Sequence, residues 1–357
     1  MKPRDPSAQQ ISVLRRRLLD WYEQNRRDLP WRRTRDPYAI WVSEIMLQQT
    51  RVAVVIERYR AFMQRFPTLV SLAGAAEDEV LALWSGLGYY RRARHMHKAA
   101  KQVAADGNCK LPATAAELRE LPGIGAYTAA AIASIAHGEA VAVVDGNVER
   151  VLCRLEGWEG GASRRRSIDE LANRLVSPDR PGDFNQALME LGATVCTPRN
   201  PQCLVCPIAA GCATLGEHKT QPRPKMQRRE IAHALVLRSV RRGRGAKLRE
   251  EAVLLERRPA HVTVMPGLWQ LPALADAEVP ESELRMTVRH AIMQVNYVVR
   301  IRSVEERDLD RLAAKNGERR WAPLAEAGGM ALTGLTRKVL IRARLLHREA
   351  TAAHAAD

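Results

Sequence analysis

The sequence contains no apolar run of the roughly 18 to 20 residues that a helix needs to cross a bilayer. Its N-terminus, MKPRDPSAQQ, also lacks the hydrophobic core of a secretion signal. There are no internal repeats and no long low-complexity tracts, so ordinary globular domains are expected. Together these absences predict a cytoplasmic protein that does not contact a membrane.

Cysteine is scarce outside one short loop. Four of the six cysteines lie in CTPRNPQCLVCPIAAGC, at Cys196, Cys203, Cys206 and Cys212. In a reducing compartment this grouping favours a metal centre over disulfides. Four thiolates in one tight loop can ligate zinc or an iron–sulfur cluster. The unequal spacing favours a 4Fe-4S cluster, because zinc sites more often come as two paired CxxC motifs.

Acidic residues are outnumbered by basic ones, 40 against 56, which gives a net charge of +16. Residues 1–224 carry 31 Lys+Arg against 24 Asp+Glu, and residues 225–357 carry 25 against 16, so both halves are basic. This distribution fits a polyanion held across the whole molecule, and it places the protein at the nucleoid. The alternative is a GC-rich genome that favours arginine codons.

The length of 357 residues and the 46% hydrophobic content allow two or three domains with substantial cores. Helical spacing dominates the first 215 residues, including one long amphipathic stretch over 52–80. Later runs such as IAHALVLRS and YVVRIRSV are typical of strands. We therefore expect a helical domain over 8–215 with the cysteine loop at 196–212, a linker over 216–230, and an α+β domain over 231–347.

Residues 121–148 read LPGIGAYTAAAIASIAHGEAVAVVDGNV and carry the most informative pattern. Pro122 and Gly123 are expected to end one helix, and Gly125 to open the next with unpaired backbone N–H groups. Such a helix start attracts a phosphate oxygen. A hydrophobic run then leads to Asp145, so the pattern predicts a DNA clamp followed by a carboxylate. A helical hairpin with glycines for tight packing is the alternative.

A second carboxyl group, Glu44, lies in a helical pattern beside Trp41 and Ile45. If Glu44 points inward among such neighbours, desolvation raises its pKa and suits it to general acid catalysis. An isolated glutamate on a helix is otherwise usually solvated.

Aromatic residues alternate with arginine in two further loops, at Trp31-Arg32 and before the basic helix that follows Tyr89. Such side chains can stack on bases and contact phosphates, or insert into a duplex. Packing of these aromatics in the protein core is the alternative.

Six motifs in this order resemble the MutY-type adenine DNA glycosylases of the helix-hairpin-helix superfamily. They are RDLPWR, WVSEIMLQQTRV, LPGIGAYTAAAI, VDGNV, the four-cysteine loop and MPGLWQLP, and the match extends over roughly residues 10–345. The resemblance implies a mainly α N-terminal helix-hairpin-helix glycosylase domain with a 4Fe-4S cluster loop, and a C-terminal α+β Nudix-like domain. It also implies a monomer that removes adenine mispaired with 8-oxoguanine or guanine in double-stranded DNA.

The resemblance also assigns catalytic roles. Glu44 matches the acid that protonates adenine, and Asp145 matches the residue that stabilises positive charge on the sugar. Asn147 and Tyr127 correspond to their hydrogen-bonding support. Endonuclease III, a relative, carries lysine at the Tyr127 position, and a phenol cannot form the Schiff base of a lyase. We therefore expect a monofunctional glycosylase; the alternatives are an endonuclease III-like lyase acting on oxidised pyrimidines and a non-catalytic DNA-binding relative.

Further positions follow from the same resemblance. Gln49 and Tyr89 match residues that wedge into the DNA stack near the oxidised guanine. Trp31, Arg32 and Glu190 lie in motifs that line the adenine pocket. The cluster is expected to be structural, shaping a basic loop around Arg199.

Two features depart from the family pattern. The sequence after GLWQLP lacks the paired glutamates of a Nudix box, so hydrolysis of nucleoside diphosphates is not expected. The usual Phe-Ser-His loop that contacts the lesion is placed at Val288-Arg289-His290, where only the histidine is kept. Arg289 could donate a hydrogen bond there. Lesion discrimination is therefore expected to depend more on Gln49 and Tyr89.

Overall fold

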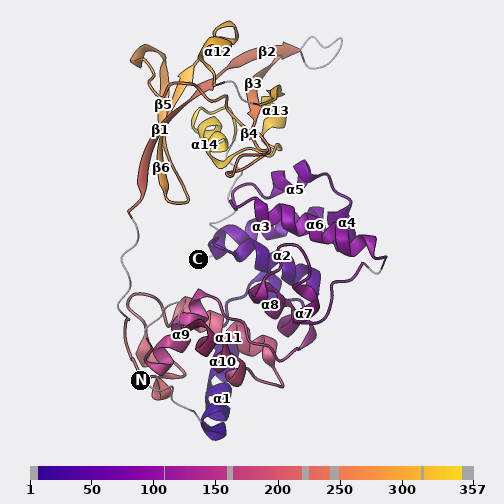
Figure 1. The fold of residues 1–357 in the computed structure, drawn as a ribbon, viewed down its shortest axis with the longest axis vertical. Coiled ribbons are helices and arrows are strands. Elements are labelled where there is room, and N and C mark those ends of the chain that lie inside the picture. Colours follow the sequence, from indigo (N-terminus) through magenta and orange to yellow (C-terminus); the bar gives the residue numbers. More distant parts are fainter. Residues whose placement is uncertain are drawn as a thin grey trace. The chain divides into compact units, whose positions relative to one another are not determined.

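The computed structural model describes residues 7–107, 109–158, 164–218, 225–241, 249–314 and 317–347. The chain divides into two compact units (Figure 1): unit 1 is Met1–Gly74 with His95–Gln221, and unit 2 is Ala75–Arg94 with Pro222–Asp357. None of the helices in the described residues is long and apolar enough to span a membrane.

Unit 1 is helical, as expected. Its helices are α1 (Ala8–Asn25), α2 (Pro37–Leu47), α3 (Val52–Arg65), α4 (Leu69–Ala73), α6 (Arg91–Ala105, from His95 onward), α7 (Ala115–Leu118), α8 (Ala126–His137), α9 (Gly146–Glu156), α10 (Arg165–Leu175) and α11 (Pro181–Thr194). The single amphipathic stretch expected over 52–80 is wrong, because separate short helices occupy it. Pro67 cannot continue α3, and the Thr68 hydroxyl caps the start of α4 by accepting the Ser71 N–H.

Two sets of helices form the interior of unit 1. Helix α2 packs on α8, and both are buried along nearly their whole length, which is typical of central helices. A second apolar cluster joins α1, α9, α10 and α11 through side chains such as Leu18, Leu152, Phe184 and Leu191. Helices α2, α8 and α9, which carry the candidate site residues, are therefore each packed against buried apolar side chains.

The turn before α8 has the geometry expected from LPGIG. Gly123 adopts φ 79°, and a Cβ there would lie 2.5 Å from the His95 Cβ, so only glycine fits. Gly125 is the N-cap of α8 and offers no side-chain cap, which leaves the N–H groups of the first helical turn open to a ligand. The sequence prediction of a glycine turn between α7 and α8 is confirmed.

Unit 2 is an α+β structure built on two sheets. One sheet has the order β1-β6-β5, with β1 (Gln227–Leu235) parallel to β6 (Val295–Ser303), and β5 (Leu284–Ile292) antiparallel to β6. In the other, β3 (Arg249–Arg257) pairs with β2 (Leu237–Arg241), β4 (Trp269–Gln270) and β7 (Arg319–Pro323). The helices are α5 (Glu77–Leu83), α12 (Glu306–Leu312), α13 (Leu324–Ala327) and α14 (Gly334–Arg342).

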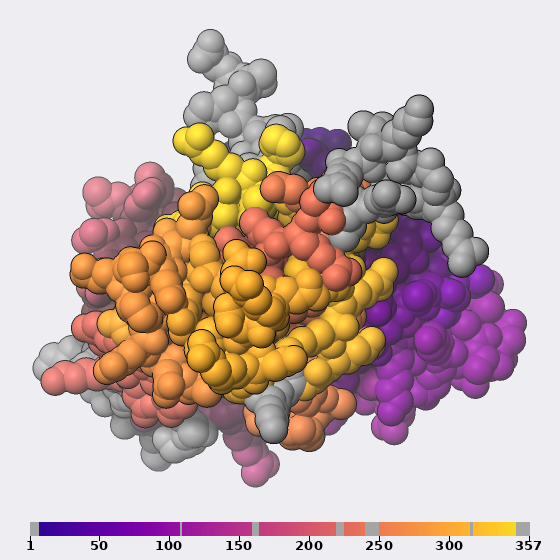
Figure 2. Space-filling view, turned by 90° about the horizontal axis from the view of Figure 1, so that it is seen from above, coloured from indigo at the N-terminus to yellow at the C-terminus, as the bar shows by residue number. Residues whose placement is uncertain are grey.

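Apolar residues from both sheets and from α14 share one core in unit 2, including Val253, Val288, Val299, Ile301 and Val339. In the space-filling view the later residues of this unit, orange to yellow, form a closely packed surface (Figure 2). The prediction of an α+β C-terminal region is confirmed, although the sequence patterns did not predict β4, β5 or β7.

Residues 75–94 group with the C-terminal residues rather than with the helical unit in which the sequence placed them. The Tyr90 hydroxyl donates to the Leu332 carbonyl at 3.2 Å, and Arg337 Nε donates to Ser85 Oγ at 2.8 Å. Such bonds join segments about 250 residues apart, and no local sequence pattern reports them.

Candidate active site

Glu44 lies on the buried helix α2 and is 5% exposed. The Tyr127 hydroxyl, from the first turn of α8, donates to Glu44 Oε2 at 2.7 Å. Burial raises the pKa of Glu44 from 4.5 to about 7; the Tyr127 hydrogen bond opposes this rise and the nearby Asp145 adds to it. Glu44 can therefore hold or release a proton near neutral pH, as general acid–base catalysis requires.

The same pairing affects Tyr127. Burial and the neighbouring Glu44 raise the pKa of the Tyr127 phenol well above 10. The phenol therefore stays neutral and keeps its proton available for the Glu44 carboxyl group.

Asp145 begins α9 as its N-cap, which explains why it stands at a defined position after a hydrophobic run. Its Oδ1 accepts the backbone N–H groups of Asn147 at 2.8 Å and Val148 at 2.7 Å. Its Oδ2 accepts the Asn147 side-chain amide at 2.9 Å. Three hydrogen bonds thus orient this carboxyl group, and its charge acts on Glu44.

Arg150 extends this arrangement, and sequence reasoning missed it. Its Nη2 donates to Asn147 Oδ1 at 2.8 Å and to the Gly192 carbonyl at 2.7 Å. Its Nε donates to the Cys196 carbonyl at 2.8 Å. Arg150 therefore links the amide that holds Asp145 to the start of the cysteine loop. The available signal was its position three residues after Asn147, on the same helix face.

The Arg150→Ala variant is expected to unfold at a temperature roughly 4–8 °C lower than wild type, because three part-buried hydrogen bonds worth on the order of 2 kcal/mol together are lost. Thermal unfolding followed by circular dichroism measures this. Arg166→Ala is the matched control, since the Arg166 side chain on α10 is 92% exposed. Equal midpoints for the two variants would contradict a bridging role for Arg150.

Glu190 is a second buried acid, but its pKa is lowered, whereas that of Glu44 is raised. Its carboxylate accepts bonds from Arg27 at 2.7 Å and from Arg32 at 2.8 Å. Burial by itself favours the neutral form, but these bonds outweigh it and hold the pKa of Glu190 at about 2. Trp31 is buried and packs edge-to-face on Tyr59 at 5.4 Å, so its ring belongs to the core.

Gln49 and Tyr89 share an unusual backbone. Both have positive φ, 55° and 47°, in the left-handed region that non-glycine residues seldom occupy. Both side chains are exposed, and the Arg92 guanidinium lies 5.5 Å from the Tyr89 ring centroid. Such strain persists where the surrounding structure imposes it, often at binding loops. Gln49 belongs to unit 1 and Tyr89 to unit 2.

The loop expected at Val288-Arg289-His290 is wrong. These residues lie inside β5, where Arg289 and His290 pair with β6, and Val288 is fully buried in the core. The exposed turn is the next segment, Met293-Gln294, between β5 and β6; Met293 is 72% exposed with φ 53°. Two alternating runs separated by two residues were the sequence signal for this hairpin.

The cysteine loop follows α11 and folds into two short turns, Cys203–Val205 and Ala209–Gly211. Burial raises the pKa of Cys206 to about 11; a backbone hydrogen bond from Ile208 opposes the rise, and the charges of the other three cysteines add to it. Three of the cysteines pack against the apolar cluster of α9 to α11, and Arg154 Nη1 donates to Cys196 Sγ at 3.4 Å.

Within the described residues, no three His, Cys, Asp or Glu side chains are grouped to hold one metal ion. A 4Fe-4S cluster takes one thiolate per iron, so a loop that carries four cysteines has the number of ligands that such a cluster needs. Arg199 is exposed on the same loop.

Comparison with known families agrees with this architecture. Residues 42–178 match the HhH-GPD superfamily base excision DNA repair proteins, and residues 196–212 match the iron-sulfur binding domain of endonuclease III. The chain belongs to the HhH-GPD superfamily of base excision DNA repair proteins. The sequence predictions of a helix-hairpin-helix domain and of a cluster loop are confirmed.

Individual relatives show more specifically which proteins the chain resembles. The chain is 51% identical over 215 residues to human adenine DNA glycosylase, covering 57% of this chain and 39% of that protein. It is 45% identical over 194 residues to the adenine DNA glycosylase of Mycolicibacterium smegmatis, covering 54% of this chain and 66% of that protein. A solved thermostable thymine-DNA glycosylase matches at 31% identity and a TM-score of 0.55, covering 59% of this chain and 99% of that chain. The chain thus spans about two fifths of the length of its human relative.

Proposed function

We propose that this chain is a monofunctional adenine DNA glycosylase, which removes adenine mispaired with 8-oxoguanine or guanine and leaves an abasic site. The observation that carries the proposal is the buried Glu44, with a pKa of about 7, held by Tyr127 and acted on by Asp145. The names of the relatives at 51% and 45% identity support the choice of adenine.

The proposed reaction divides work between two carboxyl groups in unlike environments. The duplex hides the glycosidic bond, so the adenine must first flip out, at a cost that a mispair lowers. Protonated Glu44 then donates its proton to the leaving adenine and afterwards directs a water molecule to the sugar. The Asp145 carboxylate, oriented by Asn147, stabilises the positive charge that develops on the sugar, as in glycoside hydrolysis.

The DNA-binding part of the proposal involves the backbone as well as side chains. The open N–H groups at the start of α8, after Gly123 and Gly125, suit a strand phosphate. The exposed, strained Gln49 and Tyr89 suit insertion into the base stack. We assign the contact with the oxidised guanine to the turn Met293-Gln294 instead of His290. Met293 is exposed, whereas His290 lies within a strand.

Other groups are assigned supporting roles. Arg32 and the ionised Glu190 form a rigid wall proposed to border the adenine, with Trp31 packed behind it. A bound 4Fe-4S cluster supplies a cross-link among the four cysteines, so folding of the loop and presentation of Arg199 to a phosphate depend on iron and sulfide. We place the protein on DNA as a monomer at the nucleoid.

The proposal is tested by giving the purified iron-loaded protein duplexes that differ only at one pair: adenine opposite 8-oxoguanine, guanine or thymine, thymine opposite guanine, and an oxidised pyrimidine opposite guanine. Free bases are separated by chromatography. Adenine should be released from the two mispairs, and strand breaks should appear only after alkali. Release of thymine or of the oxidised pyrimidine instead would assign the chain to another branch of its superfamily.

The Tyr127→Lys variant is expected to gain a borohydride-trappable covalent adduct with adenine-containing DNA, which wild type does not form. A lysine amine at this position could attack the sugar carbon and form a Schiff base, whereas a phenol cannot. Gel electrophoresis after borohydride treatment measures the adduct. Tyr127→Phe is the matched control and should show none. A trapped adduct with wild type would support the lyase alternative.

A further inference from the structure

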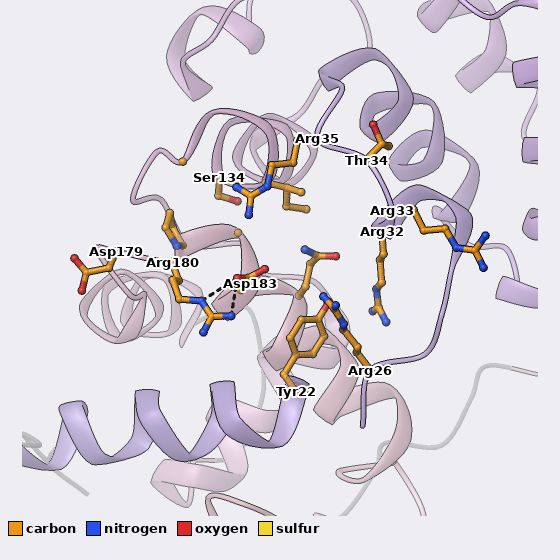
Figure 3. Close-up of a pocket in the computed structure, with 15 residues that line it drawn as sticks. Tyr22, Arg26, Arg32, Arg33, Thr34, Arg35, Ser134, Asp179, Arg180 and Asp183 are labelled. Carbon is orange, nitrogen blue, oxygen red and sulfur yellow. Dashed lines mark hydrogen bonds and ion pairs between the residues drawn. The ribbon is translucent and has the colours of Figure 1, made fainter. Parts of the chain in front are cut away.

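Unit 1 contains a cavity of about 330 Å³ (Figure 3), which shares Arg32 with the wall proposed to border the adenine. It is bordered by the last turn of α8, at Ser134 and Ile135, whereas Tyr127 lies in the first turn of that helix. The end of α1 and the start of α11 form its other walls. The arginines that line it are Arg26, Arg32, Arg33, Arg35 and Arg180, against the two acids Asp179 and Asp183.

The positive charge of this cavity is only partly neutralised. Arg180 pairs with Asp183, and Arg33 and Arg32 pair with carboxylates outside the cavity. No carboxylate in the described part of the chain pairs with Arg26 or Arg35. Figure 3 also shows the Asp179 carboxylate pointing away from the other side chains. Arg26 and Arg35 are therefore available to an anion.

A buried hydroxyl group in the cavity wall also lacks a partner. Tyr22 is 1% exposed, and its hydroxyl makes no hydrogen bond within the described residues. The ring projects from α1 toward the guanidinium groups of Arg26 and Arg32, which lie 5.9 and 5.6 Å from its centroid (Figure 3). Leaving a buried donor without a partner destabilises the fold, so a ligand oxygen that accepts a hydrogen bond from this hydroxyl would be favourable.

The start of α11 adds backbone polarity. Gly182 lies so close to α8 that a Cβ there would meet the Ser134 carbonyl oxygen at 2.7 Å, which fixes the helix end against the cavity wall. This 14-residue helix has no side-chain cap, and Asp183 in its first turn, paired with Arg180, is the only acid there.

We propose that this cavity binds a phosphate group, with Arg26, Arg35 and the Tyr22 hydroxyl as its donors. Arginine and phosphate form strong charge-assisted hydrogen bonds, and the volume lies at the lower end of small-ligand pockets, which suits one or two phosphate groups. The phosphate comes from a small compound or from a DNA strand. The proposal does not depend on the base that the enzyme removes.

Isothermal titration calorimetry of the full iron-loaded protein with inorganic pyrophosphate, at constant ionic strength, tests the site. Arg26→Gln and Arg35→Gln should each raise the dissociation constant about tenfold, and Tyr22→Phe about threefold or more. Tyr22→Phe should not lower the thermal midpoint, because the lost hydroxyl had no partner. Arg166→Gln, on the exposed face of α10, should bind as wild type does.

A short duplex titrated into the same variants identifies the source of the phosphate. Loss of duplex affinity in Arg26→Gln and Arg35→Gln, with pyrophosphate as a competitor, assigns the cavity to a strand phosphate. Unchanged duplex affinity together with weakened pyrophosphate binding assigns it to a small compound. Absence of pyrophosphate binding to wild type at millimolar concentration, or an equal loss in Arg166→Gln, would overturn the proposal.

Discussion

The Asp145→Asn variant should release adenine at least about 10³ times more slowly than wild type in single-turnover reactions, with its fold intact. The amide is isosteric but neutral, so the charge that stabilises the developing positive sugar is lost. Asparagine is also a good N-cap, and its side-chain oxygen can still accept the Asn147 and Val148 N–H groups at the start of α9. The loss would therefore be one of chemistry rather than of folding.

Asp36→Asn is the matched control for this experiment. Asp36 is likewise an N-cap, of α2, and its carboxylate accepts the Tyr38 N–H at 3.0 Å. This variant should retain wild-type turnover. Adenine release that persists in Asp145→Asn, with the circular dichroism spectrum unchanged, would remove Asp145 from the proposed mechanism.

The Glu44→Gln variant should have a larger free energy of unfolding than wild type at pH 8, which is the second large effect expected. The folded-state pKa of Glu44, about 7, lies above its ordinary 4.5. Between these values the folded state keeps a proton that the unfolded state has released, so stability is full below pH 4.5 and falls as pH rises to about 7. The difference is on the order of 3 kcal/mol, and glutamine removes it.

Glu190→Gln should have the opposite effect. The pKa of Glu190 is lowered to about 2, so this group stabilises the fold above pH 4.5 and loses that contribution as pH falls toward 2. At neutral pH the substitution leaves Arg27 and Arg32 without their anion, and it should destabilise the protein by about 3 kcal/mol.

Urea unfolding of wild type and both variants at pH 5 and pH 8 measures these two stability effects. Glu44→Gln should show a smaller fall in midpoint from pH 5 to pH 8 than wild type, and Glu190→Gln a lower midpoint at both. If Glu44→Gln is the less stable protein at pH 8, then the folded-state pKa of Glu44 is not raised above its ordinary value, and its role as an acid near neutral pH fails with it.

Features that depend on residues close together in the chain could be predicted from the sequence, whereas features that depend on distant residues could not. The glycine turn at Gly123 and the cysteine loop depend on residues adjacent in the chain, and both were predicted. Asp145 was predicted as a candidate acid but not as the N-cap of α9. The loop expected at His290 was misplaced because similarity to a family pattern located it, whereas the alternation of β5 and β6 puts the turn at Met293-Gln294, which begins three residues after His290.

The sequence by itself determined the superfamily and the cluster loop, and it singled out Glu44 and Asp145 as the proposed acids, because short motifs of fixed spacing encode turns and thiol ligands. Only the tertiary structure decided the protonation of Glu44 and Glu190. Glu44 and Tyr127 are 83 residues apart, and Glu190 meets Arg27 across 163, so their burial and charge balance exist only once distant helices pack together. The link through Arg150 and the arginine-lined cavity beside Tyr22 arise in the same way, since a pKa or an unpaired hydroxyl depends on what the fold places beside it.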